Sequence, residues 1–344
     1  MLNIYPKLAP MAGLPGYGGG PTGLGLAGAA GYVITTNAWG DRGMSFGGYI
    51  DNVGNKGMDW MDYWEISSCG GAADFGNLVE GRGNASGGGS NAARCVFSGG
   101  YNTSSPDRKN NIDYVNPAST GNASDFGDLQ TGRSGCGDAA CDGRNITSPG
   151  YNGGGNSNMD YFSIASTGNA SDFGDTSQTD TGSGAGGNGE TWVTVLGATG
   201  STSNGMDYVI AATTGNGTDF GDLAHVRGAA GGMTSDLNGS DRCVWTHDIV
   251  SGGYSDAMDY ITMSTAANAT DFGDGTAAYR QVGGTSNNVK GQLVGGNAGC
   301  ANSSGCPNYN YIRQITIDTT GNASNCSGLT NSGMGQGAAS GNAS

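Results

Sequence analysis

Several kinds of residue are scarce in this chain of 344 residues, and each scarcity excludes a class of protein. Leu, Ile, Val and Phe together supply only 47 residues, about 14%, a level typical of disordered chains when net charge is also high. Three glutamates and four lysines stand against 26 aspartates. Because Glu and Lys favour helices and Asp favours turns, little helix is predicted. No apolar run reaches 18 residues, so no membrane-spanning helix is expected.

Positive charge is also scarce, since the formal net charge is −15 and the pI is near 4.2. Such a chain is repelled by nucleic-acid phosphates and by anionic membrane surfaces, so neither partner is expected. Five glycines and two prolines between Gly13 and Pro21 interrupt any apolar signal-peptide core. Residues 1–30 are therefore predicted to form a Gly/Pro-rich arm rather than a secretory signal.

Histidine occurs only at His225 and His247, and no nucleophile elbow accompanies either residue. Both histidines are expected to be solvated or hydrogen-bonded locally. The Ser-x-Asp-x-Gly-x-x-Trp box of sialidase-type propellers is missing as well. The sequence therefore predicts a protein that is not an enzyme, with no catalytic residue, no metal ligand and no cofactor, and it leaves the ligand-binding residues unknown.

Cysteine is too sparse for a disulfide-dense scaffold, with eight residues in the whole chain. The C-x2-C spacing of zinc sites is missing too. Two pairs are close in sequence and are candidates for local disulfides: Cys136 with Cys141, and Cys300 with Cys306. The other four cysteines are expected to be buried thiols: Cys69, Cys95, Cys243 and Cys326.

The chain does contain a repeat with a period of 47 to 52 residues. Its first mark is a tyrosine that follows Asp or Asn and opens a short strand-like run. The six tyrosines are Tyr63, Tyr114, Tyr161, Tyr208, Tyr260 and Tyr311. Its second mark is a phenylalanine inside Asp-Phe-Gly. The five phenylalanines are Phe75, Phe126, Phe173, Phe220 and Phe272, and the sixth copy has Cys326 in that place.

Each unit reads as four short strands. A segment such as Arg94 to Tyr101, with a glycine pair, precedes the tyrosine strand, and a Gly/Ala-rich stretch such as Ala224 to Met233 accommodates a further strand. Gly-Asn between the tyrosine and phenylalanine strands predicts a hairpin, since both residues accept positive φ. One sheet of about 50 residues cannot bury both faces alone, whereas sheets stacked around an axis can.

The predicted fold is therefore an all-β propeller of six blades. The C-terminal stretch from Leu329 to Ser344 resembles the Gly/Ala-rich strand that precedes segments such as Arg42 to Tyr49. We expect both termini to complete one blade and so close the ring. Tyr32 to Thr36 competes for the same strand position, which leaves seven blades with one partial blade as the alternative. Residues 31–344 are assigned to the propeller.

Recurrent carboxylates, such as Asp125 with Asp128, match no defined calcium loop and are interpreted as turn residues. Asn-x-Ser/Thr sequences recur in the predicted hairpin turn and are explained by turn geometry rather than by glycosylation. The asparagines are Asn122, Asn169, Asn216, Asn268 and Asn322.

The strand that ends in Gly-Gly, the tyrosine strand and the following aromatic, at about 50 residues per unit, resemble the kelch repeat. More narrowly, the Thr-Gly-Asn-Ala-Ser-Asp-Phe-Gly-Asp sequence at Thr167 to Asp175 resembles kelch-like repeat proteins of tailed bacteriophages. The resemblance spans roughly residues 40–330. It implies a virion structural protein of the tail fibre or spike, located on the surface of an extracellular particle.

Under that resemblance, the propeller is expected to bind a glycan or protein receptor on the host surface. The arm at residues 1–30 is expected to dock it to other virion proteins, and a homo-oligomer is expected in the particle. A capsid or tail decoration protein, whose blades contact neighbouring subunits, is the first alternative. A glycan-active enzyme is the second.

Overall fold

The computed structural model describes residues 40–49, 57–84, 88–91, 93–103, 107–141, 143–197, 202–228, 236–238, 241–246, 249–250, 253–298, 309–332 and 337–341. Within these ranges every regular element is a β-strand. A search of the same ranges finds no helix able to cross a membrane. Five features of the sequence lie outside the described residues: the predicted arm, the competing strand at residues 32–36, His247, Cys300 and Cys306.

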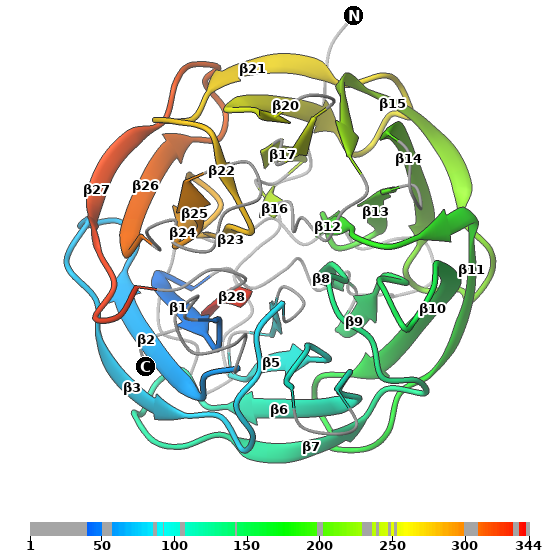
Figure 1. The fold of residues 1–344 in the computed structure, drawn as a ribbon. Helices are drawn as coiled ribbons and strands as arrows, with labels where there is room; N and C mark the ends of the chain where they lie inside the picture. The colour runs from blue at the N-terminus through cyan, green and yellow to red at the C-terminus, as the bar shows by residue number, and fades with distance from the viewer. Residues whose placement is uncertain are drawn as a thin grey trace, which may run out of the picture.

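Six antiparallel four-stranded sheets are arranged as blades around a central axis (Figure 1). In five blades the tyrosine strand lies third from the axis and the Asp-Phe-Gly strand forms the rim, and blade 6 has the same strand order without these two sequences. The predicted all-β, six-bladed propeller with four short strands per blade is therefore confirmed.

The blades are numbered here along the chain, and their strands are given from axis to rim. Blade 1 contains β28 (Gly337–Gly341), β1 (Arg42–Phe46), β2 (Trp60–Glu65) and β3 (Ala73–Asn77). Blade 2 contains β4 (Gly88–Ser90), β5 (Cys95–Ser98), β6 (Asn111–Val115) and β7 (Ser124–Asp128). Blade 3 contains β8 (Asp138–Cys141), β9 (Arg144–Thr147), β10 (Asn156–Ser163) and β11 (Ser171–Asp180).

Blade 4 contains β12 (Gly184–Gly187), β13 (Thr191–Val195), β14 (Thr202–Ile210) and β15 (Thr218–Gly228). Blade 5 contains β16 (Asp236–Asn238), β17 (Arg242–Thr246), β20 (Ala257–Thr262) and β21 (Thr270–Asp274). Blade 6 contains β23 (Gly283–Ser286), β24 (Lys290–Val294), β26 (Tyr311–Thr316) and β27 (Ser324–Gly328). Two short ribbons are added, β18 (Ile249–Val250) with β19 (Gly253–Tyr254), and β22 (Tyr279–Arg280) with β25 (Asn297–Ala298).

The ring is closed in blade 1 by strands from both ends of the described chain. β28 pairs antiparallel with β1, from Arg42 opposite Gly341 to Phe46 opposite Gly337. The expected closure by both termini is confirmed, and the seven-bladed alternative is wrong. A strand supplied from the far end of the chain satisfies the edge of β1 that would otherwise be open.

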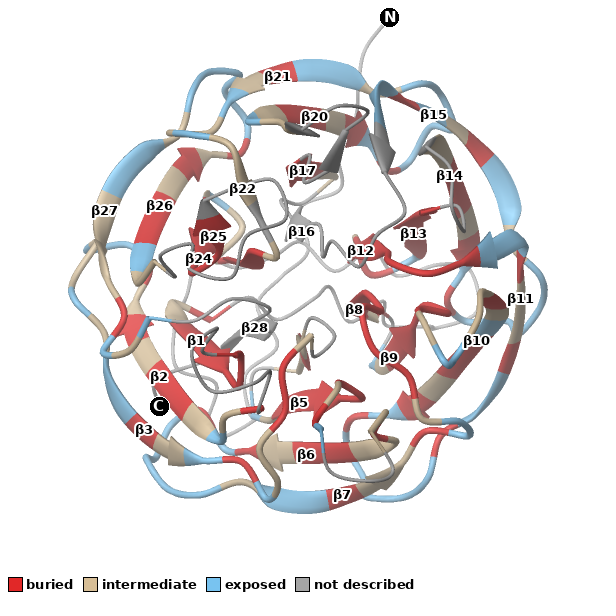
Figure 2. Cartoon of the chain, viewed as in Figure 1, coloured by how far each residue is buried: buried red, intermediate tan, exposed pale blue. Residues whose placement is uncertain are grey.

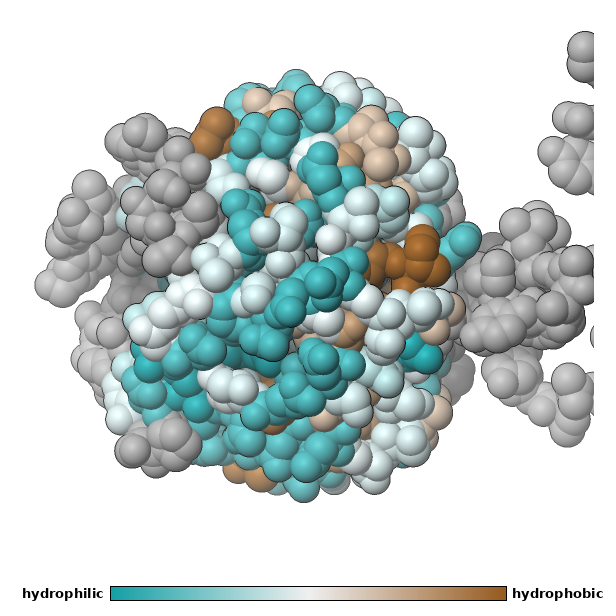
Figure 3. Space-filling view, turned by 90° about the vertical axis from the view of Figure 1, so that its right-hand side faces the viewer, coloured by the Kyte–Doolittle hydropathy of each residue, from teal (hydrophilic) through white to brown (hydrophobic). Residues whose placement is uncertain are grey.

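The core lies between neighbouring blades rather than within one. One buried cluster joins Phe75 of blade 1 to Phe97 of blade 2, and another joins Phe173 of blade 3 to Trp192 of blade 4. The inner strand β5 is buried on both faces, whereas the rim strand β7 buries only Phe126 (Figure 2). Hydrophilic residues cover most of the rim of the ring seen from the side (Figure 3).

Backbone hydrogen bonds tie each rim strand to the turn of the next blade. Gly121 N donates to Phe75 O at 2.8 Å, and Ala123 N donates to Asn77 O at 2.8 Å. Asn122 Oδ1 accepts from Asn77 N at 3.1 Å. The corresponding asparagines at four further junctions accept from Asp128, Asp175, Asp222 and Asp274: they are Asn169, Asn216, Asn268 and Asn322.

This contact corrects the interpretation of the Gly-Asn turn. The described non-glycine residues with positive φ are Cys69, Asn84, Gln281 and Asn288, and the turn asparagines are not among them. Their role is to bond the preceding blade, which turn geometry within one unit does not explain.

Candidate functional site

The predicted repeat residues meet in pairs inside five blades. The tyrosine of each third strand packs edge-on against the phenylalanine of the rim strand, with ring centroids 5.7–6.0 Å apart. The pairs are Tyr63 with Phe75, Tyr114 with Phe126, Tyr161 with Phe173, Tyr208 with Phe220, and Tyr260 with Phe272. The phenylalanines are buried and the tyrosines half-buried, so these residues hold the blades together.

Four arginines lie over these tyrosines and reach into the next blade. Each guanidinium is 4.2–4.9 Å from the ring centroid, and each donates to a carbonyl of the following blade at 2.7–3.2 Å. The arginines are Arg42, Arg94, Arg144 and Arg242. A cation over an aromatic face adds attraction to the hydrogen bond, so one side chain stabilises two blades.

The sixth tyrosine of the sequence repeat was wrongly assigned. Met44 pairs with Tyr63 in blade 1, and the equivalent pair in blade 6 is Gln292 with Gln314. Gln314 therefore occupies the repeat position, while Tyr311 lies three residues earlier at the start of β26. The error arose because an Asn-Tyr dipeptide happens to fall close to the expected spacing.

Polar groups replace the aromatic pair where blade 6 meets blade 1. Trp64 Nε1 donates to Gln292 Oε1, and Gln292 Nε2 donates to Gln314 Oε1 at 3.0 Å and to Ile66 O at 3.1 Å. The bonds from Gln292 to Trp64 and to Ile66 join blade 6 to blade 1.

The disulfide expectations need two corrections. Cys69 and Cys326, expected to be thiols, form a disulfide with their Cα atoms 5.3 Å apart and a sequence separation of 257. Cys136 and Cys141 are two buried thiols that are not bonded to each other. Cys141 ends strand β8, and an extended chain separates residues five apart by more than the roughly 7 Å that a disulfide allows.

A buried aspartate recurs one residue before each repeat tyrosine, and sequence reasoning missed its role. In each case its carboxylate accepts a hydrogen bond from the backbone N–H of a residue in the rim strand of the preceding blade or just after it. The acceptor and donor pairs are Asp62 with Thr330, Asp113 with Val79, Asp160 with Gln130, Asp207 with Ser177, and Asp259 with His225. The only sign of this role in the sequence was that an aspartate recurs before the repeat tyrosine.

Two of these aspartates also form buried ion pairs. Arg82 lies 3.0 Å from Asp113 and Arg133 lies 2.6 Å from Asp160, and all four side chains are essentially inaccessible to solvent. Burial raises the pKa of both carboxyl groups, while the arginine beside each one lowers it. These perturbed carboxyls are engaged in contacts between blades, which is a structural use.

The rim aspartates lie in strands rather than in the turns that were expected. Asp125 belongs to β7 and stands opposite Asp113 in the pairing of β6 with β7. The same opposition of a buried and an exposed carboxylate recurs in other blades, including Asp62 with Asp74 and Asp259 with Asp271.

His225 adds an imidazole to one of these carboxylate pairs. Its Nδ1 lies 2.9 Å from Asp259 Oδ1, and its backbone N donates to Asp259 Oδ2 at 3.1 Å. One ligand atom from each of His225, Asp259 and Asp271 lies within 4.8 Å of the other two. His225 is hydrogen-bonded as expected, but its partner belongs to the next blade rather than to its own.

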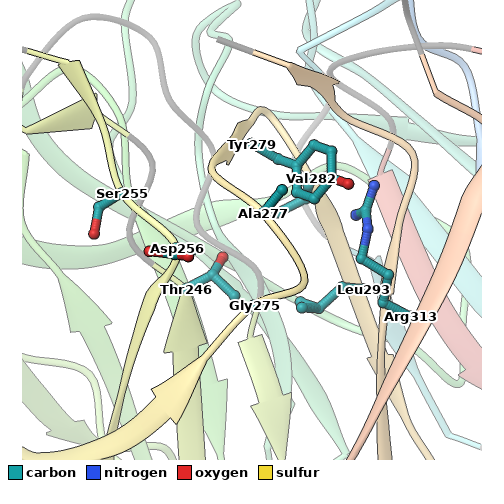
Figure 4. Close-up of a pocket in the computed structure, with 9 residues that line it drawn as sticks. All are labelled: Thr246, Ser255, Asp256, Gly275, Ala277, Tyr279, Val282, Leu293 and Arg313. Atoms are coloured by element: carbon teal, nitrogen blue, oxygen red, sulfur yellow. The ribbon is translucent and has the colours of Figure 1, made fainter. Parts of the chain in front are cut away.

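A small pocket lies between blades 5 and 6 (Figure 4). Arg313, which replaces the repeat aspartate in blade 6, forms one wall, and its guanidinium lies 3.6 Å from the centroid of the Tyr279 ring. Asp256 and Ser255 lie at the opposite side. The pocket brings together one buried cation and one exposed carboxylate.

Comparison with known proteins assigns no family to this ring. No family model matches the chain, and no curated protein matches it. The function therefore has to be argued from the chain itself.

Proposed function

We propose that this protein is a recognition propeller displayed on a virus particle, in a tail fibre or spike, where it attaches the particle to its host. The observation that carries the proposal is the covalently sealed ring. A disulfide joins blade 6 to blade 1, and disulfides persist in oxidising surroundings outside the cytosol.

The assignment of a binding role follows from how the polar groups are used. The buried carboxylates Asp62, Asp113 and Asp160 bond neighbouring blades, so their perturbed chemistry serves the rigidity of the ring. A rigid ring presents loops on its two faces, and loops held by a rigid scaffold are common recognition surfaces. Because propellers host many functions, the fold by itself selects none of them. The proposed location on a virus particle rests on the resemblance of the repeat to phage kelch-like repeats.

Two measurements on the same protein test this proposal. Immunogold labelling of purified particles is expected to place the protein at the tail, and the isolated, fluorescently labelled protein is expected to bind host cells saturably. Deletion of residues 1–30 is expected to abolish incorporation into particles while leaving cell binding unchanged.

The outcomes separate the alternatives. Labelling over the capsid or tail without cell binding favours a decoration protein whose blades contact neighbouring subunits. Cleavage of a host glycan by the isolated protein supports the enzyme. Particles that carry none of the protein contradict the proposal outright.

A further inference from the structure

The junction between blades 4 and 5 differs from the other junctions that share its carboxylate pair. At the equivalent place, blades 1, 2, 3 and 6 present Val79, Gln130, Ser177 and Thr330 to the buried aspartate of the next blade. None of these side chains carries an imidazole. Blade 4 presents His225, which adds a nitrogen ligand to the two carboxylates.

His225 lies within β15, beside an irregularity in the pairing of that strand. The pairing of β14 with β15 shifts register between Ser203 and Gly205, because several extra residues of β15 are accommodated there. The residue that bonds Asp259 comes five positions after Phe220, whereas Gln130 comes four positions after Phe126. The pairing of β10 with β11 contains a similar shift between Asn156 and Asn158, yet Ser177 comes four positions after Phe173. The extra position before His225 is therefore particular to blade 4.

The three side chains form a compact and accessible set. Asp259 is fully buried, the His225 side chain is 45% exposed, and Asp271 is exposed at the rim. Two ligands about 2.1 Å from one metal ion lie roughly 3–4 Å from each other. The separations at this site, 2.9 Å for one pair and at most 4.8 Å for all three, fit that requirement after small rotations.

We propose that His225, Asp259 and Asp271 bind a first-row divalent cation, with Zn²⁺ as the reference ion. Imidazole nitrogen with carboxylate oxygen suits Zn²⁺, whereas Ca²⁺ takes oxygen ligands alone. The two carboxylates neutralise the dication, and three protein ligands leave one position for water or a carboxylate of a bound partner. The neutral imidazole is the ligand, so binding weakens in acid.

The test is calorimetric titration of Zn²⁺ into untagged protein. Wild type is expected to bind one ion, and His225→Ala and Asp271→Asn are each expected to weaken binding roughly tenfold or more. Asp172→Asn is the matched control, because Asp172 is the exposed carboxylate opposite Asp160 in blade 3. His247→Ala is the control for the second histidine. Both controls are expected to bind like wild type.

X-ray absorption at the zinc edge is expected to show a single imidazole among oxygen ligands. Unchanged binding by His225→Ala contradicts the proposal, as does the failure of wild type to bind Zn²⁺ at about 1 mM. Stronger binding of Ca²⁺ than of Zn²⁺, with several ions per chain, also contradicts the proposal. That result would place the metal at the aspartate pairs of several blades rather than at His225.

Discussion

At the residue scale, the buried aspartate that precedes each repeat tyrosine has a different side-chain partner at different junctions. Arg82 and Arg133 pair with it at two junctions, Thr330 at the seam, and His225 at another. A charge without solvent is costly unless it is bonded. Each aspartate therefore joins its own blade to the preceding blade by a hydrogen bond.

Asp62 allows the cost of burying this carboxylate to be measured, because no arginine of the described residues forms an ion pair with it. Burial raises its pKa, hydrogen bonds from Thr330 lower it, and the charge on Asp74 raises it again, with a net increase. A carboxyl whose pKa is raised on folding stabilises the protein below its unfolded pKa of about 3.9. That stabilisation is lost as pH rises through the folded pKa.

Asp62→Asn is therefore expected to gain stability relative to wild type as pH rises from about 3.5 to 7, by about 1.4 kcal/mol for each unit of pKa difference. Urea unfolding across this pH range measures the gain. Asp74→Asn, which removes the neighbouring charge, is expected to reduce the pH dependence without abolishing it. Identical pH profiles for Asp62→Asn and wild type would show that the Asp62 pKa is not raised.

At the element scale, glycine sets how closely neighbouring blades approach. Gly76 in rim strand β3 has a φ of 145°, and a Cβ there would lie 2.4 Å from Gly121 O in blade 2. The same approach recurs at Gly127 against Gly168 O. The hydrogen bonds between the rim strand and the turn require the two backbones to lie this close together. A side chain at Gly76 would leave no room for that approach.

Gly76→Ala is expected to lower the free energy of unfolding by about 2 kcal/mol or more, since it combines a strained φ with a backbone clash. Gly121→Ala is the matched control from the same junction, because a Cβ at Gly121 meets nothing within 4 Å. Its effect is expected to stay within about 0.5 kcal/mol. Urea unfolding measures both, and equal losses would contradict the role given to Gly76.

Much of each element could be read from the sequence, but the partners between blades could not. The Asp-Tyr and Asp-Phe-Gly marks located the third and fourth strands of five blades, because the period is nearly constant. In the sixth blade the Asp-Tyr pattern wrongly placed the repeat tyrosine at Tyr311. Gln314 and Cys326, which have no aromatic ring, occupy the two repeat positions there. The bond from Asn122 to blade 1 was invisible, because a repeat spacing gives no information about which units touch.

At the scale of the whole molecule, a chain poor in large apolar residues folds because its blades share their cores. Phe75 and Phe97 come from different blades, and each blade buries its faces against two neighbours. Six blades and closure by the C-terminal strand were predictable from the repeat. The candidate metal site was not, since His225, Asp259 and Asp271 meet only across the junction of two blades.

Three features join the first and last blades of the ring. β28 joins β1, Gln292 bonds across to Trp64 and Ile66, and Cys69 is linked to Cys326. Because the disulfide closes a long loop, its removal is expected to cost about 2–5 kcal/mol. The disulfide therefore stabilises the closed ring relative to the unfolded chain.

Peptide mapping without reduction tests the sealed ring most directly. Protein purified under oxidising conditions is denatured, alkylated and digested. The structure predicts one linked peptide pair that contains Cys69 and Cys326, with Cys95, Cys136, Cys141 and Cys243 recovered as alkylated thiols. Recovery of Cys69 and Cys326 in separate linear peptides would contradict the covalent closure described here.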